Sequence, residues 1–108
     1  MTRTRFYIGL KSKHGELLNL SDEAIVGRFT DERTKDLCQA FSIVRQMGVW
    51  KGDIEPSIVI ECIHEDNKPS PIELPAIARD VAFWFEQEAV LFTTEKVFAK
   101  LVYDDENW

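Results

Sequence analysis

The residues of this sequence that are best suited to chemistry lie in one short turn, Trp50-Lys51-Gly52-Asp53. An indole ring can stack on a planar ligand, and a neighbouring ammonium group can pair with a phosphate or lie over an aromatic ring. The same tryptophan can instead fold over the turn and pack on the edge of a helix. The residue types leave both interpretations open, a ligand site and an aromatic anchor.

A second pair of polar residues, Gln87 and Glu88, follows the last predicted helix. Their amide and carboxylate groups can hydrogen-bond a ligand or the edge of the first strand, although Glu88 can equally be a solvated helix terminus. The basic residues near the start of the chain could hold an anion or simply line a solvated strand edge. The ligand-binding residues that we predict from the sequence are Tyr7, Arg45, Trp50, Lys51, Gln87 and Glu88.

Metal-binding and catalytic patterns are weak. His64, Glu65 and Asp66 are adjacent, but neighbours on a strand point apart, and a zinc site needs three or four convergent ligands. Cys38 and Cys62 have neither a metal-binding spacing nor a Cys-His signature. The sequence also contains no P-loop and no G-x-G-x-x-G motif. We therefore predict no metal, no cofactor and no catalytic residue, and a non-enzymatic role is favoured.

Composition limits the class of protein. The 108 residues, 44% of them hydrophobic, suffice for one domain with a modest core. Thirteen basic and nineteen acidic residues give a net charge of −6, which disfavours general DNA binding. In so acidic a chain, pairs such as Glu55 and Glu61 are too common to indicate acid–base catalysis. No stretch approaches the ~20 apolar residues that span a bilayer, and the first ten residues lack the apolar region of a signal peptide. A reduced, cytoplasmic protein is expected.

Hydrophobic periodicity predicts the elements that must position these residues. A strand over 4–10 alternates apolar and polar side chains, and Ser21 followed by two acidic residues predicts a helix start. Residues 40–50 and 57–63 are predicted to form a hairpin across a turn at 51–56. The second of these strands, SIVIECI, is an almost continuous apolar run of the kind found at the centre of a sheet.

The second half of the chain predicts a helix and two late strand segments. The helix starts near Pro75 and carries an apolar stripe of Leu74, Ile77, Ala78, Val81, Trp84 and Phe85. AVLFTT and VFAKLVY are the strand segments, and residues 104–108 form an acidic tail. The order is β-α-β-β-α-β with an extra C-terminal strand segment. That order predicts one ferredoxin-like α+β domain over residues 1–103, with two helices on one face of an antiparallel sheet.

Two apolar surfaces are expected to remain uncovered on a single subunit. Phe83 falls opposite the apolar stripe of its helix, and the open sheet face carries Tyr7, Val59 and Ile63. Exposed apolar patches on a small domain indicate contact with another chain. The sequence therefore predicts a homodimer or a higher oligomer that uses Phe83, Val59 and Ile63.

Four stretches, RFYIGL, GVWKG, SIVIECI and FEQEAVL, together resemble a family of small bacterial and phage domains of unknown function. In that family they correspond to a first strand, a Gly-x-Trp hairpin turn, a central strand and a Phe-x-Gln-Glu-x-Val-Leu segment. The resemblance spans roughly Thr2 to Tyr103 and departs at TDERTKDLCQAF, where the start of the second strand is not obvious. It implies a ferredoxin-like fold, often a dimer, and no established chemistry.

Three classes of function follow. The first is a non-catalytic module that binds a small molecule, and the phage character of the resemblance suggests a sponge for a nucleotide-like signal. The second is a protein–protein inhibitor or adaptor with an acidic surface, for example an anti-defence protein that acts on a host protein. The third is a small isomerase or monooxygenase-like enzyme, a type common on this fold. We expect the first.

Overall fold

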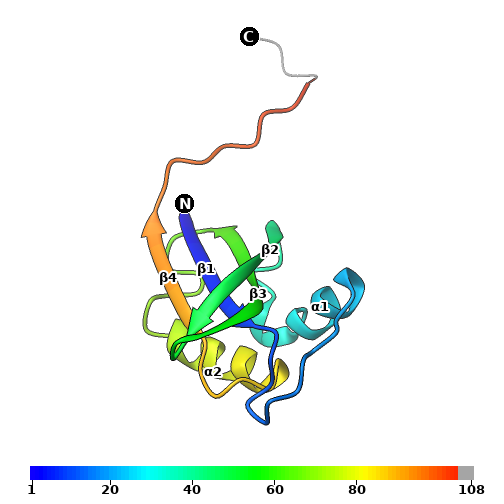
Figure 1. Ribbon diagram of the computed structural model, residues 1–108. Helices are drawn as coiled ribbons and strands as arrows, with labels where there is room; N and C mark the ends of the chain where they lie inside the picture. The colour runs from blue at the N-terminus through cyan, green and yellow to red at the C-terminus, as the bar shows by residue number, and fades with distance from the viewer. Residues whose placement is uncertain (105–108) are drawn as a thin grey trace.

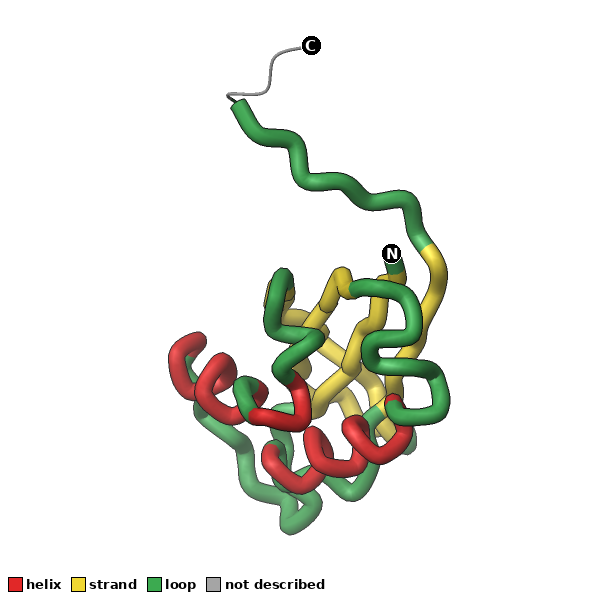
Figure 2. The backbone as a smooth tube through the Cα atoms, turned by 180° about the vertical axis from the view of Figure 1, so that it is seen from behind, coloured by secondary structure: helices red, strands yellow, loops and turns green. Residues whose placement is uncertain are grey.

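The computed structural model describes residues 1–104, in which two helices cover one face of a four-stranded antiparallel sheet (Figures 1 and 2). The strands lie in the order β2-β3-β1-β4, so β2 and β4 are the edges. This is the predicted α+β class. The elements along the chain are β1 (Thr2–Gly9), α1 (Asp22–Phe29), the 3-10 turn η1 (Glu32–Thr34), β2 (Phe41–Trp50), β3 (Asp53–His64), α2 (Leu74–Trp84) and β4 (Leu91–Lys96).

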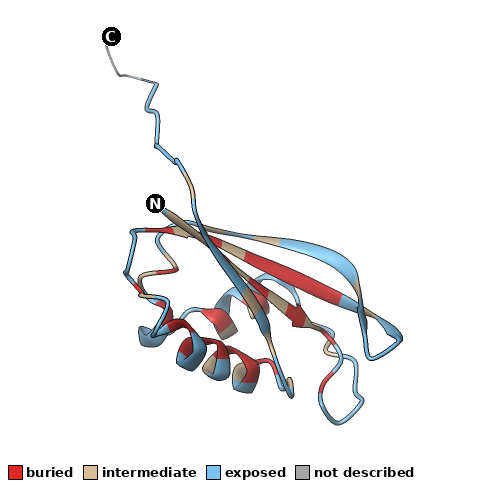
Figure 3. Ribbon diagram, turned by 90° about the vertical axis from the view of Figure 1, so that its left-hand side faces the viewer, coloured by how far each residue is buried: buried red, intermediate tan, exposed pale blue. Residues whose placement is uncertain are grey.

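The core lies between the helices and the sheet face that they cover (Figure 3). Phe6 and Ile8 of β1 and Ile60 of β3 are fully buried there. They alternate with residues of the open face because successive strand side chains point to opposite sides. The Phe6 ring meets the Phe29 ring of α1 edge-on, with centroids 5.7 Å apart. Each such buried side chain contributes roughly 1.5–3 kcal/mol.

Helix α1 begins where the sequence predicts. The Ser21 hydroxyl accepts a hydrogen bond from the Ala24 N–H at 3.1 Å, which satisfies one of the free donors of the first turn. Ile25 and Phe29, four residues apart on one side of the helix, are buried. The eight-residue helix is therefore held by its cap and by two core contacts.

Helix α2 carries the predicted apolar stripe and ends in a left-handed turn. Pro75 lies in its first turn, where a missing N–H costs little. At the other end Glu86 has φ 54°, and the Gln87 N–H donates to the Ala82 carbonyl at 2.8 Å. This pattern terminates a helix by satisfying its last carbonyls. It also fixes the position of Gln87 beside the end of β1.

The turn between β2 and β3 is shorter than the predicted turn at 51–56. Only Lys51 and Gly52 separate β2 from β3, and both have positive φ, 50° and 84°. A two-residue turn of this kind matches the twist of the strands it joins, and Gly52 adopts the left-handed conformation without strain. Pro56, predicted within the turn, lies inside the twelve-residue strand β3.

The predicted extra strand at the C-terminus is absent from the structure. Residues 97–103 have no regular secondary structure and run away from the body of the protein (Figure 1). The pairing of β4 with β1 ends at Lys96, opposite Thr2, and one further backbone hydrogen bond joins the Val97 N–H to the Met1 carbonyl at 2.9 Å. The predicted acidic tail at 104–108 lies, apart from Asp104, outside the described residues.

The residues considered for metal binding have separate structural roles. His64 is buried and its Nε2 lies 2.7 Å from the Thr4 hydroxyl, while the Thr2 hydroxyl donates to Asp66 and lowers the pKa of that carboxyl. Within residues 1–104, no three His, Cys, Asp or Glu side chains are grouped to hold a metal ion.

The two cysteines, Cys38 and Cys62, are free thiols. Cys62 belongs to the core, and its burial raises the pKa of its thiol. The two helices of the described chain are too short and too polar to cross a membrane.

Candidate functional site

A cleft of about 480 Å³ opens at the hairpin end of the sheet. Its floor comes from the end of β1, and its walls come from the hairpin, the 11–15 loop and the 87–91 segment. Tyr7, Gly48 and Trp50 line it, and strand alternation puts these residues on the face that the helices leave open. The cleft has the volume typical of sites for small organic ligands, about 300–1,000 Å³.

The two polar motifs picked out in the sequence meet in this cleft. Trp50, the last residue of β2, is 47% exposed and its Nε1 donates to Glu88 Oε1 at 3.2 Å. Lys51 Nζ reaches the same oxygen at 2.9 Å and lies 5.6 Å from the centroid of the Trp50 ring. The hydrogen bonds from Lys51 and Trp50 hold the pKa of Glu88 below its ordinary value. The hydrogen bond to Glu88 thus fixes the Trp50 indole at the opening of the cleft, where about half of the residue stays exposed.

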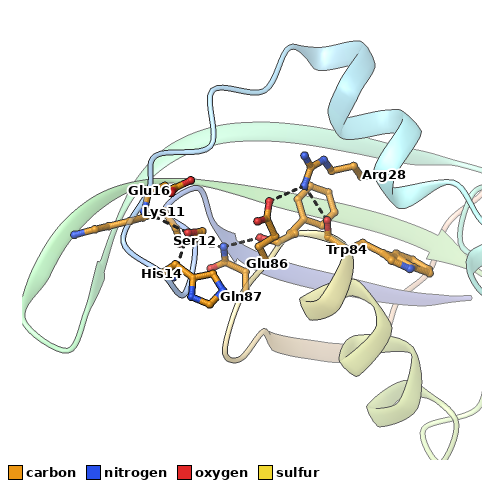
Figure 4. Close-up of polar contacts among 9 residues, drawn as sticks. Lys11, Ser12, His14, Glu16, Arg28, Trp84, Glu86 and Gln87 are labelled. Carbon is orange, nitrogen blue, oxygen red and sulfur yellow. Dashed lines mark hydrogen bonds and ion pairs between the residues drawn. The ribbon is translucent and has the colours of Figure 1, made fainter.

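Two acceptor oxygens stand close above Gly9 at the end of β1. A methyl group added at Gly9 would lie 2.5 Å from Glu55 Oε1 and 2.8 Å from Gln87 Oε1. Gln87 Nε2 donates to the carbonyls of Lys11 at 3.1 Å and Phe85 at 2.8 Å, so the amide is held with its oxygen free to accept (Figure 4). A glycine in a strand often marks such a close approach.

The 11–15 loop is folded by its own hydrogen bonds (Figure 4). The Ser12 hydroxyl accepts from the N–H groups of His14 and Glu16, each at 3.2 Å, and the Lys13 N–H donates to the Glu86 carbonyl at 2.7 Å. This arrangement joins the loop to the end of α2 and brings Lys11 and Lys13 into the lining of the cleft.

The charged lining of the cleft is balanced. Its three lysines are matched by three carboxylates, so the formal charge of the lining is zero. Lys51 is already paired with Glu88, whereas no hydrogen-bond or ion-pair partner is found for the Glu55 carboxylate among the described residues. The charged residues of the lining are Lys11, Lys13, Lys51, Asp53, Glu55 and Glu88.

Solved structures of similar fold include two structures of phage SAM lyase. A phage SAM lyase in complex with S-methyl-5'-thioadenosine aligns with a TM-score of 0.67 and 17% identity, over 88% of this chain and 80% of that one. The apo state of a phage SAM lyase aligns with a TM-score of 0.67 and 21% identity, over 87% and 78%. A DUF3240 family protein from Shewanella baltica OS155 aligns with a TM-score of 0.55 and 11% identity, over 95% and 97%.

These likenesses concern the fold, because fewer than a quarter of the aligned residues are identical. No protein-family model and no curated protein sequence matches the chain. The likenesses therefore do not indicate what the cleft of this chain binds.

The structure brings five of the six predicted ligand-binding residues to the cleft. These are Tyr7, Trp50, Lys51, Gln87 and Glu88.

Arg45 lies outside the cleft because strand alternation turns it to the helix-covered face. There it donates to the Asp22 carboxylate at 2.9 Å and to the Leu20 carbonyl at 2.8 Å, beside the start of α1. Of the four basic residues near the start of the chain, Arg3 and Arg5 are also engaged elsewhere. Both pair with Glu61, and Arg3 also pairs with Glu95.

Sequence reasoning missed Glu55 and Gly9 as parts of the site. Glu55 was one acidic residue among nineteen, and nothing local distinguishes it. Gly9 did carry a signal, because it interrupts the run of side chains in the first strand. Glu55 lies close to Gly9 because β1 pairs with β3, with Gly9 opposite Ser57.

The three residues predicted for an interface differ in the surface that they offer. Phe83 is 71% exposed on α2, Ile63 is half-buried, and Val59 is only 9% exposed within the subunit. The open face also carries the ion pair between Arg5 and Glu61, 2.7 Å long. Phe83 therefore presents most of its surface and Val59 very little. The role of all three in assembly stays a prediction.

Proposed function

We propose that the cleft binds a nucleoside-like small molecule and that the protein is a non-catalytic binding module. The observation that carries the proposal is the presence in one cleft of an exposed indole, Trp50, and two acceptor oxygens, from Glu55 and Gln87. An exposed indole stacks on a planar base. Carboxylate and amide oxygens accept hydrogen bonds from the hydroxyl or amino groups of a nucleoside.

The charges that line the cleft favour some nucleoside-like ligands over others. A polyphosphate needs an excess of positive charge, and the lining of this cleft has none. Lys11 and Lys13 can each interact with one anionic group, while the Glu55 carboxylate favours a donor or a cation. A neutral nucleoside or a zwitterionic derivative fits these groups better than a nucleoside triphosphate does.

Calorimetry with three probes tests the proposal. We expect S-methyl-5'-thioadenosine and adenosine to bind and adenosine triphosphate to bind more weakly. Glu55→Ala removes a charged acceptor, whose loss costs about 1.5–3 kcal/mol, or roughly ten- to 150-fold in affinity. Ile72→Ala, at an exposed position that does not line the cleft, serves as the control and should leave affinity unchanged. Absence of binding for both nucleosides would refute the proposal.

A second candidate is an enzyme that cleaves SAM (S-adenosylmethionine). It is favoured by the similar fold of two phage SAM lyase structures, one of them with S-methyl-5'-thioadenosine bound. Two carboxylates of the cleft, Asp53 and Glu55, have no partner among the described residues, and Glu55, which lies close to Gly9, is the one that we propose would act on a cationic substrate. Incubation of the protein with SAM, followed by chromatography, separates the candidates. Formation of S-methyl-5'-thioadenosine that is lost in Glu55→Ala supports the enzyme, and binding without turnover supports the module.

The wider form of the proposal is a phage-type sponge, an anti-defence protein of the cytoplasm that sequesters a nucleoside-like signal. The stacking and acceptor groups of the cleft suit sequestration, which requires no catalytic dyad. Native mass spectrometry of protein purified from infected and uninfected cells tests this form. A nucleoside-sized mass should be retained only from infected cells.

We propose that the domain is ferredoxin-like, because β1-α1-β2 and β3-α2-β4 each connect strands that have one other strand between them. A crystal structure with a different strand order would overturn this assignment.

A further inference from the structure

We propose that the outer edge of β2 pairs with the same edge of β2 in a second copy of this protein, antiparallel and about a two-fold axis at Gln46. The two four-stranded sheets then form one continuous sheet across the dimer. The inference is independent of the cleft and of its ligand. It concerns the backbone groups of β2 that the sheet of one copy leaves without partners.

Alternate residues of β2 direct their backbone groups away from the sheet. The Pro56 carbonyl of β3 accepts a hydrogen bond from the Leu10 N–H at 2.9 Å, so the backbone of Pro56 faces β1 and not β2. Met47, which lies opposite Pro56 in the β2–β3 ladder, therefore points its N–H and C=O outward, as does every second residue from there. Within residues 1–104, no strand and no loop backbone provides hydrogen bonds for these outward groups. They belong to Ile43, Arg45, Met47 and Val49.

The edge of β2 lacks the features that normally keep an edge strand from pairing. It is ten residues long, contains no proline and has one charged residue, Arg45. The Arg45 guanidinium is engaged at the start of α1 in its own copy, where it donates to the Asp22 carboxylate at 2.9 Å and to the Leu20 carbonyl at 2.8 Å. A long edge with little free charge readily accepts another strand, because its N–H and C=O groups gain partners.

Apolar side chains flank this edge on both faces of the sheet. Val44 is exposed on the open face, and Met47 and Val49 are exposed on the other face. Ile54, which lies opposite Val49 in the hairpin, is exposed beside them. Burial of apolar surface and pairing of the backbone would therefore occur together when a second strand is added.

Symmetry and charge select the register. In a two-fold pair, the outward-facing residues of one copy lie opposite those of the other. A pair centred on Arg45 would set two guanidinium groups directly opposite each other, which is unfavourable. A pair centred on Met47 aligns only residues 44–50 of the two copies. A pair centred on Gln46 aligns residues 42–50 and avoids the contact between like charges.

The side chains of β2 fit one another in the register centred on Gln46. On the face of the helices, Arg45 of one copy lies opposite Met47 of the other. On the open face, Val44 lies opposite Gly48, which has no side chain to crowd it. Each pair of outward-facing residues exchanges two backbone hydrogen bonds. The edge of β2 is thus complementary to itself.

The outer edge of β4 is a poorer partner for β2. It has six residues and carries Glu95 and Lys96. A contact between β2 of one copy and β4 of the next is also heterologous, so it leaves a free edge at each end and continues into an open filament. Pairing of β2 with β2 closes after two copies and leaves only the short β4 edges outside.

Light scattering and hydrogen exchange test the dimer. We expect the full chain at micromolar concentration to have twice the 12.5 kDa mass of one copy, with slow exchange of the outward-facing amides of β2. Met47→Pro removes an outward N–H that the fold of one copy does not use. It should fall to one copy, and the amides of Ile43 and Val49 should exchange at least tenfold faster. Met47→Ala keeps the N–H and should keep the mass. Circular dichroism and urea unfolding establish that both variants are folded.

Two charge substitutions at Met47 test the register. Met47→Glu puts a carboxylate opposite Arg45 of the second copy and should keep the dimer. Met47→Lys puts an ammonium group opposite the same guanidinium and should raise the dissociation constant of the dimer at least tenfold. In a pair centred on Met47, either substitution would set like charges against each other. Dissociation of both variants would therefore overturn the register centred on Gln46.

Two further variants separate this interface from other surfaces. Ile72→Asp changes an exposed apolar residue in the loop before α2 and should leave the mass unchanged. Phe83→Asp should also leave it unchanged, and a fall to one copy in that variant would place the contact on α2 and contradict the proposal. A wild-type chain that is monomeric, or a Met47→Pro variant that keeps its mass and its β2 protection, would overturn the proposal.

Discussion

The two ends of strand β3 differ in what lies beneath them. Ile60 is fully buried under the helices, whereas Ile54, six residues earlier and on the same side of the strand, is 69% exposed. Both residues are paired with β2, Ile60 with Ile43 and Ile54 with Val49. The helices end before the hairpin does, so its tip extends beyond the core (Figure 3). The covered end contributes to the stability of the fold, and the uncovered end contributes Trp50 and Glu55 to the cleft.

The largest effect expected from this comparison is on stability at the covered end. Ile60→Ala removes core atoms and leaves a cavity, so the free energy of unfolding should fall by about 2–5 kcal/mol. Ile54→Ala is the matched substitution at the tip and should change it by less than about 1 kcal/mol. Urea unfolding of both variants measures the difference. Equal losses would show that the tip is packed against something that the single chain does not contain.

Loss of ligand affinity at the uncovered end should come next in size. Trp50→Ala removes the stacking surface, which is worth about 1–3 kcal/mol per base, or roughly five- to 150-fold in affinity for S-methyl-5'-thioadenosine. Its free energy of unfolding should change by less than about 1 kcal/mol, because the ring is half exposed. Trp50→Phe retains an aromatic ring and should recover part of the affinity. A loss of stability near 3 kcal/mol would instead identify Trp50 as an aromatic anchor of the fold.

A smaller effect is expected where β1 meets the cleft. Gly9→Ala places a methyl group within 3 Å of both Glu55 and Gln87. The Glu55 carboxylate is the end of a flexible side chain and should move aside, whereas a shift of the Gln87 amide weakens its hydrogen bonds to Lys11 and Phe85, so the melting temperature should fall slightly. Affinity for the nucleoside should fall several-fold, because the two acceptors lose their positions. Gly27→Ala, where the added methyl meets open space on α1, is the control and should leave affinity unchanged. Unaltered affinity in Gly9→Ala would exclude the pair from the site.

The smallest effect concerns the pH dependence of the indole contact. The hydrogen bonds from Lys51 and Trp50 lower the pKa of Glu88. A carboxyl whose pKa is lower in the folded state contributes its pairing fully above its ordinary pKa and loses it as pH falls through the lowered value. The NMR shift of the Trp50 indole N–H should therefore change only below the ordinary pH range for glutamate titration.

Glu88→Gln is the reference variant for that titration, because the amide does not ionise in this range. Its Trp50 indole signal should show no change over the same pH interval. A transition at or above the ordinary pKa of glutamate in the wild-type chain would contradict the contact between Trp50 and Glu88.

Much of the fold could be read from local patterns. The Ser21 cap, the stripe of α2 and the apolar run of β3 each depend on residues close together in the chain, and each lies where it was predicted. The two misplacements have different causes, one local and one not. The turn at Lys51-Gly52 needed only two residues because both adopt positive φ. The segment at 97–103 has the sequence of a strand, but β4 ends at Lys96 because that residue lies opposite Thr2, where β1 begins.

The sequence by itself determined the elements, the exposed phenylalanine on α2 and the presence of a tryptophan beside a lysine in a turn, because these follow from periodicity and turn chemistry within a few residues. Only the tertiary structure decided which polar residues share a cleft. Strand pairing brings Gly9 level with Ser57, and the end of α2 places Gln87 beside Gly9. These positions depend on contacts between residues far apart in the chain, and no local pattern records such contacts.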